Sequence, residues 1–389
     1  MTADWGFVTG EYPPQRGGVA DYSALIANRL ADMGERVSVW APRVRHAADA
    51  DDGDVAVHRL QSGFGIRSLA TLGRDVERRG APRVWLVQYV PQAFGYRGMN
   101  LAFCVWLARR REPVWTVFHE VSFPFVSRQP ARHRVLAAVT RIMAAVVARA
   151  SERVFVTTPA WAPILRTIAP DAPAAEWVPV PSTIARVGDR QEARAIVRRY
   201  GGRSGRVIGH FGSCGPLIAD QLAVAIPALL QRAPDASMML LGDGCAALRR
   251  RLVDAFPGLA GRLWETGPLA ARDISSHLLA CDIMLQPYAE GVTTRRTSVM
   301  AALVHGVATV TTSGRLTEPL WQETGAVALA RAGDPSALAA VASRLLGDPE
   351  TRARIGTTGR SVYDACFDVR HTVAALGSRV RPDAVSVGR

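Results

Sequence analysis

Residues 5–41 decide the fold class, and they read WGFVTGEYPPQRGGVADYSALIANRLADMGERVSVWA. Two apolar, β-branched runs, Trp5–Thr9 and Val37–Ala41, flank a segment with helical periodicity at 21–33. The apolar positions of that segment are Tyr22, Leu25, Ile26, Ala27 and Leu30. A glycine pair precedes the helix, and Gly34 is a natural stop. The stretch therefore predicts a strand–helix–strand unit with a glycine-rich loop after the first strand.

The same alternation continues along the whole chain. The further strand candidates are Val55–Arg59, Val84–Val90, Val114–Phe118, Val154–Thr158, Trp177–Val180, Val207–Phe211, Met238–Leu241, Leu263–Glu265, Ile283–Gln286, Ala308–Thr312 and Ala326–Leu329. Their near-continuous apolar character is typical of parallel strands that are buried on both faces. The predicted fold class is α/β, with doubly wound, Rossmann-like sheets.

A stretch rich in proline and glycine divides the chain into halves of similar size. Its residues are Pro170, Pro173, Pro179, Pro181, Gly188, Gly201 and Gly202. We place a linker within 180–204, between an N-terminal domain over 1–185 and a C-terminal domain over 205–365. Doubly wound domains bind ligands at the carboxyl ends of their strands, and two facing domains make a cleft.

Length and composition limit the class of protein. The chain has 389 residues, 48% of them apolar, and no apolar run near the ~20 residues that span a bilayer. The N-terminus lacks the pattern of a secretory signal, so we expect a soluble cytoplasmic protein. All 47 basic residues are arginine, which excludes Schiff-base and P-loop lysine chemistry. The net charge of +13 comes without a nucleic-acid-binding signature, so we expect no nucleic acid as a partner.

The cysteines and the acidic clusters indicate no metal. The five cysteines form no Cys-x-x-Cys pair and are odd in number, so we expect reduced core thiols rather than a disulfide or a zinc site. A carboxylate cluster lies in a polar stretch, which favours a solvated loop over a cation site. Its members are Asp49, Asp51, Asp52 and Asp54.

Two constellations belong to the first half. Gly17 and Gly18 allow close backbone approach before a helix whose free N–H groups suit an anion or a sugar oxygen. The alternative is a glycine turn with Asp21 as a cap. His119 ends the strand 114–118, where an imidazole reaches a ligand; the alternative is a structural histidine.

A third constellation follows the strand 283–286 and reads PYAEGVTTRRTS, residues 287–298. Glycine and threonines at a helix start, with Arg295 and Arg296, are typical of a diphosphate site. Glu290 suits hydrogen bonds from sugar hydroxyls. The alternative is a capped surface helix with a solvated arginine pair.

Together these motifs resemble family 4 of the retaining GT-B glycosyltransferases. The resemblance covers nearly the whole chain. It is carried by the opening Pro13–Ser23, His119, Val178–Ser182, Val207–Gly212, Leu240–Gly244, Thr266–Leu269, Ala280–Asp282 and the Glu290 loop. It implies sugar transfer from a nucleotide donor, with retention at the anomeric carbon, no required metal and no tightly bound cofactor.

The resemblance also implies roles for individual residues. The N-terminal domain binds the acceptor, the C-terminal domain binds the nucleotide sugar, and 366–389 cross back to the first domain. Gly17 and Gly18 face donor phosphate or acceptor, His119 approaches the donor sugar, and Glu290 is the first Glu of the family's two-glutamate motif. The remaining donor-binding positions are Gly212, Ser213, Gly267, Leu269, Gly291, Val292, Thr293, Thr294 and Ser298.

Two departures from the family pattern stand out. Ser298 replaces the second glutamate, and the segment to Gly306 is longer than usual. Residues 212–217 lack the basic pair that neutralises the diphosphate in the family. We infer that Arg295 and Arg296 replace that pair and stabilise the leaving diphosphate.

Loop aromatics and arginines of the first half indicate a partner surface. Phe94, Tyr96, Phe123 and Phe125 suit an apolar acceptor site. Arginines lie in the same region, at 109–111 and at 128, 132, 134, 141 and 149. They suit peripheral contact with an anionic membrane that carries a lipid-linked acceptor, or simply form a solvated face.

The sequence therefore predicts a glycosyltransferase that uses a nucleotide-diphosphate sugar. The acceptor class stays open between a glycan, a lipid-linked glycan and a small molecule. Two rival functions remain: a non-catalytic relative that binds nucleotide sugar or a partner, and an inverting enzyme or sugar-nucleotide epimerase on the same fold.

Overall fold

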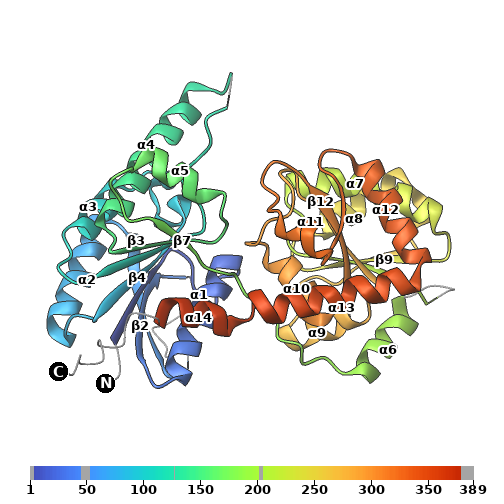
Figure 1. The fold of residues 1–389 in the computed structure, drawn as a ribbon, viewed down its shortest axis with the longest axis horizontal. Coiled ribbons are helices and arrows are strands. Elements are labelled where there is room, and N and C mark those ends of the chain that lie inside the picture. Colours follow the sequence, from blue (N-terminus) through green and yellow to red (C-terminus); the bar gives the residue numbers. More distant parts are fainter. Residues whose placement is uncertain (1–3, 45–52, 127, 201–204, 378–389) are drawn as a thin grey trace, which may run out of the picture. The chain divides into compact units, whose positions relative to one another are not determined.

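The computed structural model describes residues 4–44, 53–126, 128–200 and 205–377 (Figure 1). Asp49, Asp51 and Asp52 of the acidic stretch lie outside them. The chain forms two compact units: residues 1–179 with 369–389, and residues 180–368. The interval 180–204, expected as a linker, contains helix α6 (Arg190–Tyr200), which packs against a helix of the second unit.

The first unit is built on a seven-stranded sheet of order β3-β2-β1-β4-β5-β6-β7. All neighbouring strands pair in parallel, as the apolar runs predict. The strands are β1 (Asp4–Thr9), β2 (Arg36–Pro42), β3 (Val55–Phe64), β4 (Val84–Tyr89), β5 (Val114–Phe118), β6 (Arg153–Val156) and β7 (Ala175–Trp177). The strand order reverses direction between β1 and β4, which is where ligands bind in such sheets.

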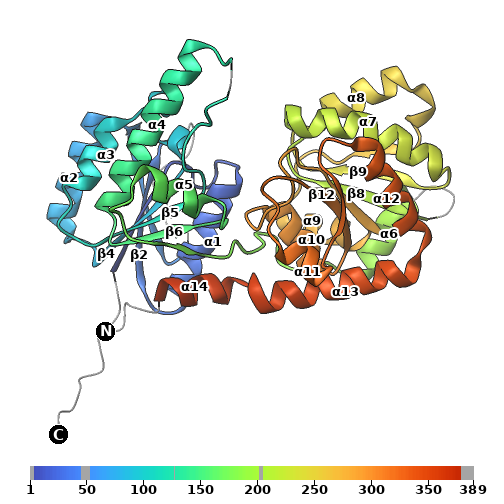
Figure 2. The ribbon, with the colours of Figure 1, turned by 45° about the horizontal axis from the view of Figure 1, so that its top comes forward.

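Helices cover both faces of this sheet. They are α1 (Gly18–Asp32), α2 (Ile66–Arg79), η1 (Pro91–Phe94), η2 (Tyr96–Gly98), α3 (Leu101–Ala108), α4 (Ala131–Ala150), α5 (Trp161–Ile168) and α14 (Val369–Gly377). Figures 1 and 2 show α2, α3 and α4 on one side of the sheet, and α1 with α14 on the other. The core beneath α2–α4 is rich in aromatic side chains, among them Trp85, Phe94 and Phe103.

The C-terminal helix α14 belongs to the first unit. Arg153 donates a hydrogen bond from its guanidinium to the carbonyl of Ala375 over 3.2 Å. Thr372 donates from its hydroxyl to the carbonyl of Pro179 over 2.8 Å, and it is fully buried. These bonds fix the returning segment beside the sheet, on the side of α1.

The second unit is built on a six-stranded sheet of order β10-β9-β8-β11-β12-β13. The strands are β8 (Val207–Phe211), β9 (Ser237–Leu241), β10 (Leu263–Glu265), β11 (Ile283–Gln286), β12 (Ala308–Ser313) and β13 (Ala328–Arg331), all paired in parallel. Here the order reverses between β8 and β11. The helices besides α6 are α7 (Pro216–Arg232), α8 (Ala246–Ala255), η3 (Pro257–Leu259), α9 (Ala271–Leu279), α10 (Thr297–His305), α11 (Leu320–Thr324), α12 (Pro335–Gly347) and α13 (Pro349–Cys366).

Successive residues of the second sheet enter two separate apolar cores, since side chains alternate between the faces of a strand. Ile208 and Leu240 pack beneath α7, α8 and α12. Val207 and Met239 pack on the opposite side with residues of α9 and α10. Figure 2 shows these two helix layers on either side of the sheet. In the part of the chain that the structure describes, no helix is long and apolar enough to cross a membrane.

Candidate functional site

His119 lies at the carboxyl edge of the first sheet, directly after β5. Its Nε2 lies 2.8 Å from the side-chain oxygen of Gln88, and its ring meets the Tyr22 ring edge-on at 4.9 Å. The carbonyl of His119 accepts a hydrogen bond from the Trp161 indole over 3.1 Å. The imidazole is 8% exposed, so it is oriented by neighbours and still reaches the surface at this edge.

Three carboxylates gather at the same edge. Glu11 follows β1, Asp21 lies in the first turn of α1, and Glu120 follows His119. Burial raises the pKa of Glu11, and the negative charges of Glu120 and Asp21 raise it further. A side chain added at Gly17 would begin 2.8 Å from Glu11 Oε2, so the glutamate lies against the glycine loop. This edge is therefore negative, although no sequence motif marks Glu11 or Glu120 as site residues.

The expected loop aromatics have different environments. Phe94 is 1% exposed and belongs to the core, whereas Tyr96 is 59% exposed. Both line a cavity of about 280 Å³, together with Pro42, residues 62–65, Ala93 and Gly95. Phe125, in the segment before α4, is exposed and lies beneath the Arg141 guanidinium at 4.7 Å. Phe94 therefore forms part of the cavity wall, but little of its side chain is accessible to a ligand.

Three loops meet at the carboxyl edge of the second sheet. Gly212 follows β8 with φ +138°, and Gly242 follows β9 with φ +121°. A Cβ at Gly242 would lie 2.9 Å from the Gly212 carbonyl, so only glycine permits this approach. Gly242 also pairs with Gly267 after β10. Gly212, exposed Ser213, Gly267 and half-buried Leu269 therefore lie along one edge of the sheet.

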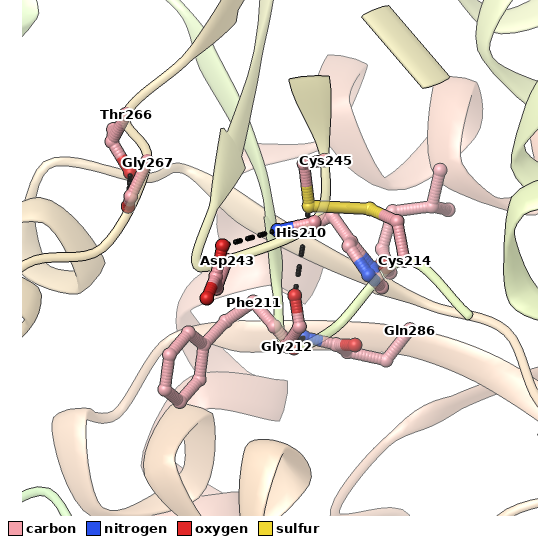
Figure 3. Close-up of a disulfide and its surroundings, with 11 residues drawn as sticks. His210, Phe211, Gly212, Cys214, Asp243, Cys245, Thr266, Gly267 and Gln286 are labelled. Carbon is pink, nitrogen blue, oxygen red and sulfur yellow. Dashed lines mark hydrogen bonds between the residues drawn. A yellow bond between two sulfur atoms is a disulfide. The ribbon is translucent and has the colours of Figure 1, made fainter. Parts of the chain in front are cut away.

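A disulfide joins two of these loops, which corrects the expectation of reduced thiols. Cys214 in the β8–α7 loop bonds to Cys245 at the start of α8, with a Cα–Cα distance of 5.1 Å. Figure 3 shows the bond beside Gly212, whose carbonyl oxygen lies 3.6 Å from the Cys245 sulfur. The sequence hid this pair because 31 residues separate the two cysteines. The pairing follows from the strand order, since each cysteine comes after the end of one of two adjacent parallel strands, β8 and β9.

Most of the loop from β11 to α10 is buried. Gly291, Val292, Thr293 and Thr294 have almost no exposed surface. The Thr294 amide and hydroxyl both donate to the carboxylate of Glu318, over 3.0 and 2.9 Å. Of the residues expected to bind the donor here, Thr294 is therefore engaged with the protein itself.

The two arginines of this loop lie beside Tyr288. The Arg296 guanidinium stacks on the Tyr288 ring at 4.4 Å. Burial raises the pKa of Tyr288, and the charges of Arg296 and Arg295 act in the opposite direction. The Tyr288 hydroxyl and Ser298 Oγ are 2.8 Å apart. Within the described residues, the buried Arg296 Nε has no hydrogen-bond partner.

The arginine loop and the Gly212 loop are neighbours. A side chain added at Gly212 would begin 3.9 Å from the Ser298 Cβ. Ser298 thus lies in the first turn of α10 and contacts the loop that follows β8. This is the point where the strand order of the second sheet reverses. The helix start, Arg296 and the glycine backbone converge there, and each favours an anion.

The segment after β12 supports the arginine loop, although no sequence motif marks it as part of the site. Arg315 forms an ion pair with Glu290 at the surface. Leu316 donates its amide to the Glu290 carbonyl over 3.0 Å. Arg315 lies 25 residues from Glu290 in the sequence, and the two segments become neighbours because β12 pairs with β11.

A cationic edge with a glycine backbone suits the phosphates of a nucleotide. Across the described residues, no group of three or more His, Cys, Asp or Glu is arranged to hold a metal ion. Guanidinium and backbone N–H groups at this edge can bind phosphate oxygens.

Comparison with known proteins relates the second unit to sugar transfer. Residues 205–348 match the family model described as "Glycosyl transferases group 1". The sequence matches no curated protein at a significant level.

Solved structures establish the fold of the whole chain. Sucrose-phosphate synthase from Thermosynechococcus elongatus superposes with a TM-score of 0.75 at 15% identity, over 96% of this chain and 98% of that one. HepE from Anabaena in complex with UDP gives 0.69 at 17% identity, over 96% and 98%. UDP-GlcNAc 2-epimerase from Neisseria meningitidis gives 0.59 at 11%, again over 96% and 98%. The chain has the GT-B fold, and with the family match this supports a glycosyltransferase of GT-B type.

Proposed function

We propose that this chain transfers a sugar from a nucleotide-diphosphate sugar to an acceptor hydroxyl, with retention of anomeric configuration and without a metal ion. One observation carries the proposal. Arg296, the start of α10 and the Gly212 loop converge at the strand-order reversal of the second sheet. Together they provide the positive charge and N–H groups that a leaving diphosphate needs.

The donor residues follow from that convergence. Arg295 and Arg296 hold the diphosphate, next to the backbone of Gly212 and Ser213. The base lies against Gly267 and Leu269, whose loop adjoins Gly242. Glu290, half-buried and paired with Arg315, accepts hydrogen bonds from the sugar hydroxyls. HepE was solved with UDP, so UDP is the first nucleotide to test.

The acceptor side is assigned to the first unit. The carboxylates of Glu11, Asp21 and Glu120 oppose a phosphate at the glycine loop, since like charges repel. Of the two roles that the resemblance leaves to Gly17 and Gly18, this favours the acceptor. His119, held by Gln88, is assigned to hydroxyls of the sugar that is transferred.

The proposed step balances without a further reactant. The bond between the anomeric carbon and the diphosphate oxygen breaks, and a bond from the acceptor oxygen forms on the same face. The acceptor proton passes to the departing phosphate oxygen. The arginine guanidiniums stabilise the negative charge that develops on that oxygen, which lowers the barrier.

Thermal unfolding of the purified chain with UDP, GDP, ADP, dTDP and their sugar conjugates tests donor binding. A ligand at ~100 times its Kd adds about 2.7 kcal/mol to the free energy of unfolding. We expect one base to stabilise the protein, and the sugar's added effect to disappear in Glu290→Ala. Stabilisation by none of the four nucleotides contradicts the proposal and favours a non-catalytic relative.

The product distinguishes the rival reactions. A retaining transferase gives the donor's anomeric configuration, and an inverting enzyme gives the opposite one, which proton NMR of the product reads directly. An epimerase changes the sugar nucleotide with no acceptor present. Full turnover in EDTA is expected, because the charge on the diphosphate is balanced by arginine.

Contact with an anionic membrane is proposed as the place where the acceptor is met. Its support is the exposed surface of α4 and the preceding loop, which mixes apolar and basic groups. The exposed apolar and basic residues there include Phe125, Val126, Arg128, Arg132, Arg134, Val135 and Ile142. Co-sedimentation with vesicles of phosphatidylglycerol, and none with phosphatidylcholine alone, is the expected result.

A further inference from the structure

The base of the arginine loop is held by one buried carboxylate. Glu318 lies after β12, is 8% exposed and accepts hydrogen bonds from at least three donors. The Thr294 amide is bifurcated between its two oxygens, at 3.0 and 3.2 Å. The Thr294 hydroxyl lies 2.9 Å away, and the Trp321 indole N–H is 2.8 Å from the second oxygen.

The supporting residues are themselves fixed. Trp321 is fully buried and stacks on Phe367 with an interplanar angle of 4°. A Cβ at Gly314 would lie 2.7 Å from the Glu290 carbonyl, so the two loops are in direct contact at the other end as well. Glu318 is therefore a rigid acceptor under a loop whose next two residues are Arg295 and Arg296.

We propose that Glu318 is a positioning residue for the diphosphate-binding arginines, an inference that rests on the proposed function. By capturing both donors of Thr294, it fixes the backbone at the residue before the pair. The guanidiniums then face the ligand without an ordering cost on binding. Burial of a carboxylate is unfavourable unless its oxygens are satisfied, and here they are satisfied by the loop.

Charge and positioning predict opposite effects, which makes the proposal testable. Replacing Glu318 by Gln removes a negative charge near two arginines, and this alone strengthens binding of an anion. The same change places an NH2 group against an N–H or O–H donor, so at least one of the three donors loses its acceptor, and the network that fixes Glu318 beneath the loop is weakened. Positioning therefore predicts weaker binding, and electrostatics alone predicts tighter binding.

The experiment measures the Kd for UDP by titration calorimetry, well below each variant's unfolding temperature. We expect E318Q to raise the Kd at least tenfold. T294V removes one of the bonds to Glu318 with little change of volume, and should raise it about threefold. T309V is the matched control, since it removes another buried threonine hydroxyl, which donates to the Val307 carbonyl near the start of β12, at the edge of the sheet opposite the arginines; it should lower the Tm but keep the Kd within twofold.

Each outcome decides between the claims. If the wild type binds UDP, and E318Q and T294V bind it equally well or more tightly, the role of Glu318 is overturned. The proposed function is then left intact. If E318Q does not fold, T294V alone gives the answer. If T309V weakens UDP binding as much as T294V does, loss of stability explains both and positioning is rejected. If the wild type does not bind UDP, both the role of Glu318 in UDP binding and the use of a UDP-sugar donor are overturned.

Discussion

The carboxyl edges of the two sheets share a topology and differ in charge. In the first unit, the glycine loop is surrounded by Glu11, Asp21 and Glu120. In the second unit, the corresponding edge carries Arg295 and Arg296 beside Tyr288. One Rossmann-like edge therefore disfavours an anion and the other favours it. The fold supplies the place for a ligand, and a few charged side chains decide which ligand is bound.

Acidification is expected to cause the largest change in the free energy of unfolding, and the change should differ between the two units. Buried His210 of β8 and His305 of α10 each have a pKa lowered to about 4, mainly by desolvation. Because the unfolded chain binds protons below about 6.5, the second unit loses stability as the pH falls from 6.5 to 4. The loss is roughly 3 kcal/mol for each histidine.

Hydrogen exchange of β8 and β1 peptides at pH 7, 5.5 and 4.5 checks this asymmetry. Protection of β8 should fall with pH, while the raised pKa values of Glu11 and Asp21 favour the first unit in acid. His210→Gln keeps a hydrogen-bond donor and should weaken the pH dependence. Equal pH dependence of both units would contradict the prediction.

Reduction of the disulfide should destabilise the second unit alone. Cys214 and Cys245 close a loop of 31 residues, for which chain entropy gives about 3–4 kcal/mol. Urea denaturation with and without a dithiol reductant measures the loss. The variant with Ser at both positions should show the reduced protein's stability under both conditions, and an unchanged midpoint in the wild type would rule the contribution out.

Removal of Arg295 and Arg296 tests whether this pair binds the diphosphate at the carboxyl edge of the second sheet. The double variant of Arg295→Ala and Arg296→Ala should weaken UDP binding about 100-fold, or about 2.7 kcal/mol, because two charge-assisted contacts are lost. Arg251→Ala is the matched control, since this exposed arginine pairs with Asp220 elsewhere on the unit. Equal affinity in both proteins would falsify the assignment of the diphosphate.

Neutralising the acidic edge should have the smallest effect. The pKa of Glu11 is higher in the folded chain than its value of 4.5 in the unfolded chain. Ionised Glu11 therefore destabilises the folded chain once the pH rises above 4.5. Glu11→Gln should therefore stabilise the protein at pH 7.5 by about 0.5 kcal/mol, the scale of one like-charge contact. Below pH 4 the gain should vanish, and denaturation curves at both pH values check it.

The sequence predicted the layers of the fold because they depend on local patterns. Apolar runs such as Val84–Val90 end within a residue of the observed strand. Helix α1 begins three residues earlier than the predicted segment, directly after Gly17, since the glycine pair already forms its start. Motifs confined to one loop, such as Arg295–Arg296 before α10, were equally visible.

Features that depend on which strands are neighbours could not be read from the sequence. Glu318 meets Thr294 because β12 lies beside β11, and Cys214 meets Cys245 because β8 lies beside β9. Glu11 and Glu120 follow strands on different sides of β4 and become neighbours only in the sheet. The apolar runs do not encode the strand order. The strand order therefore determines which charged and supporting side chains meet at the site.

Hydrogen exchange of the full-length chain with and without UDP tests the central claim most directly. We predict that UDP protects peptides covering 212–215 and 288–298, and leaves those covering 11–21 unchanged. Protection confined to the acidic glycine loop of the first unit, with none at the arginine loop, would contradict the account.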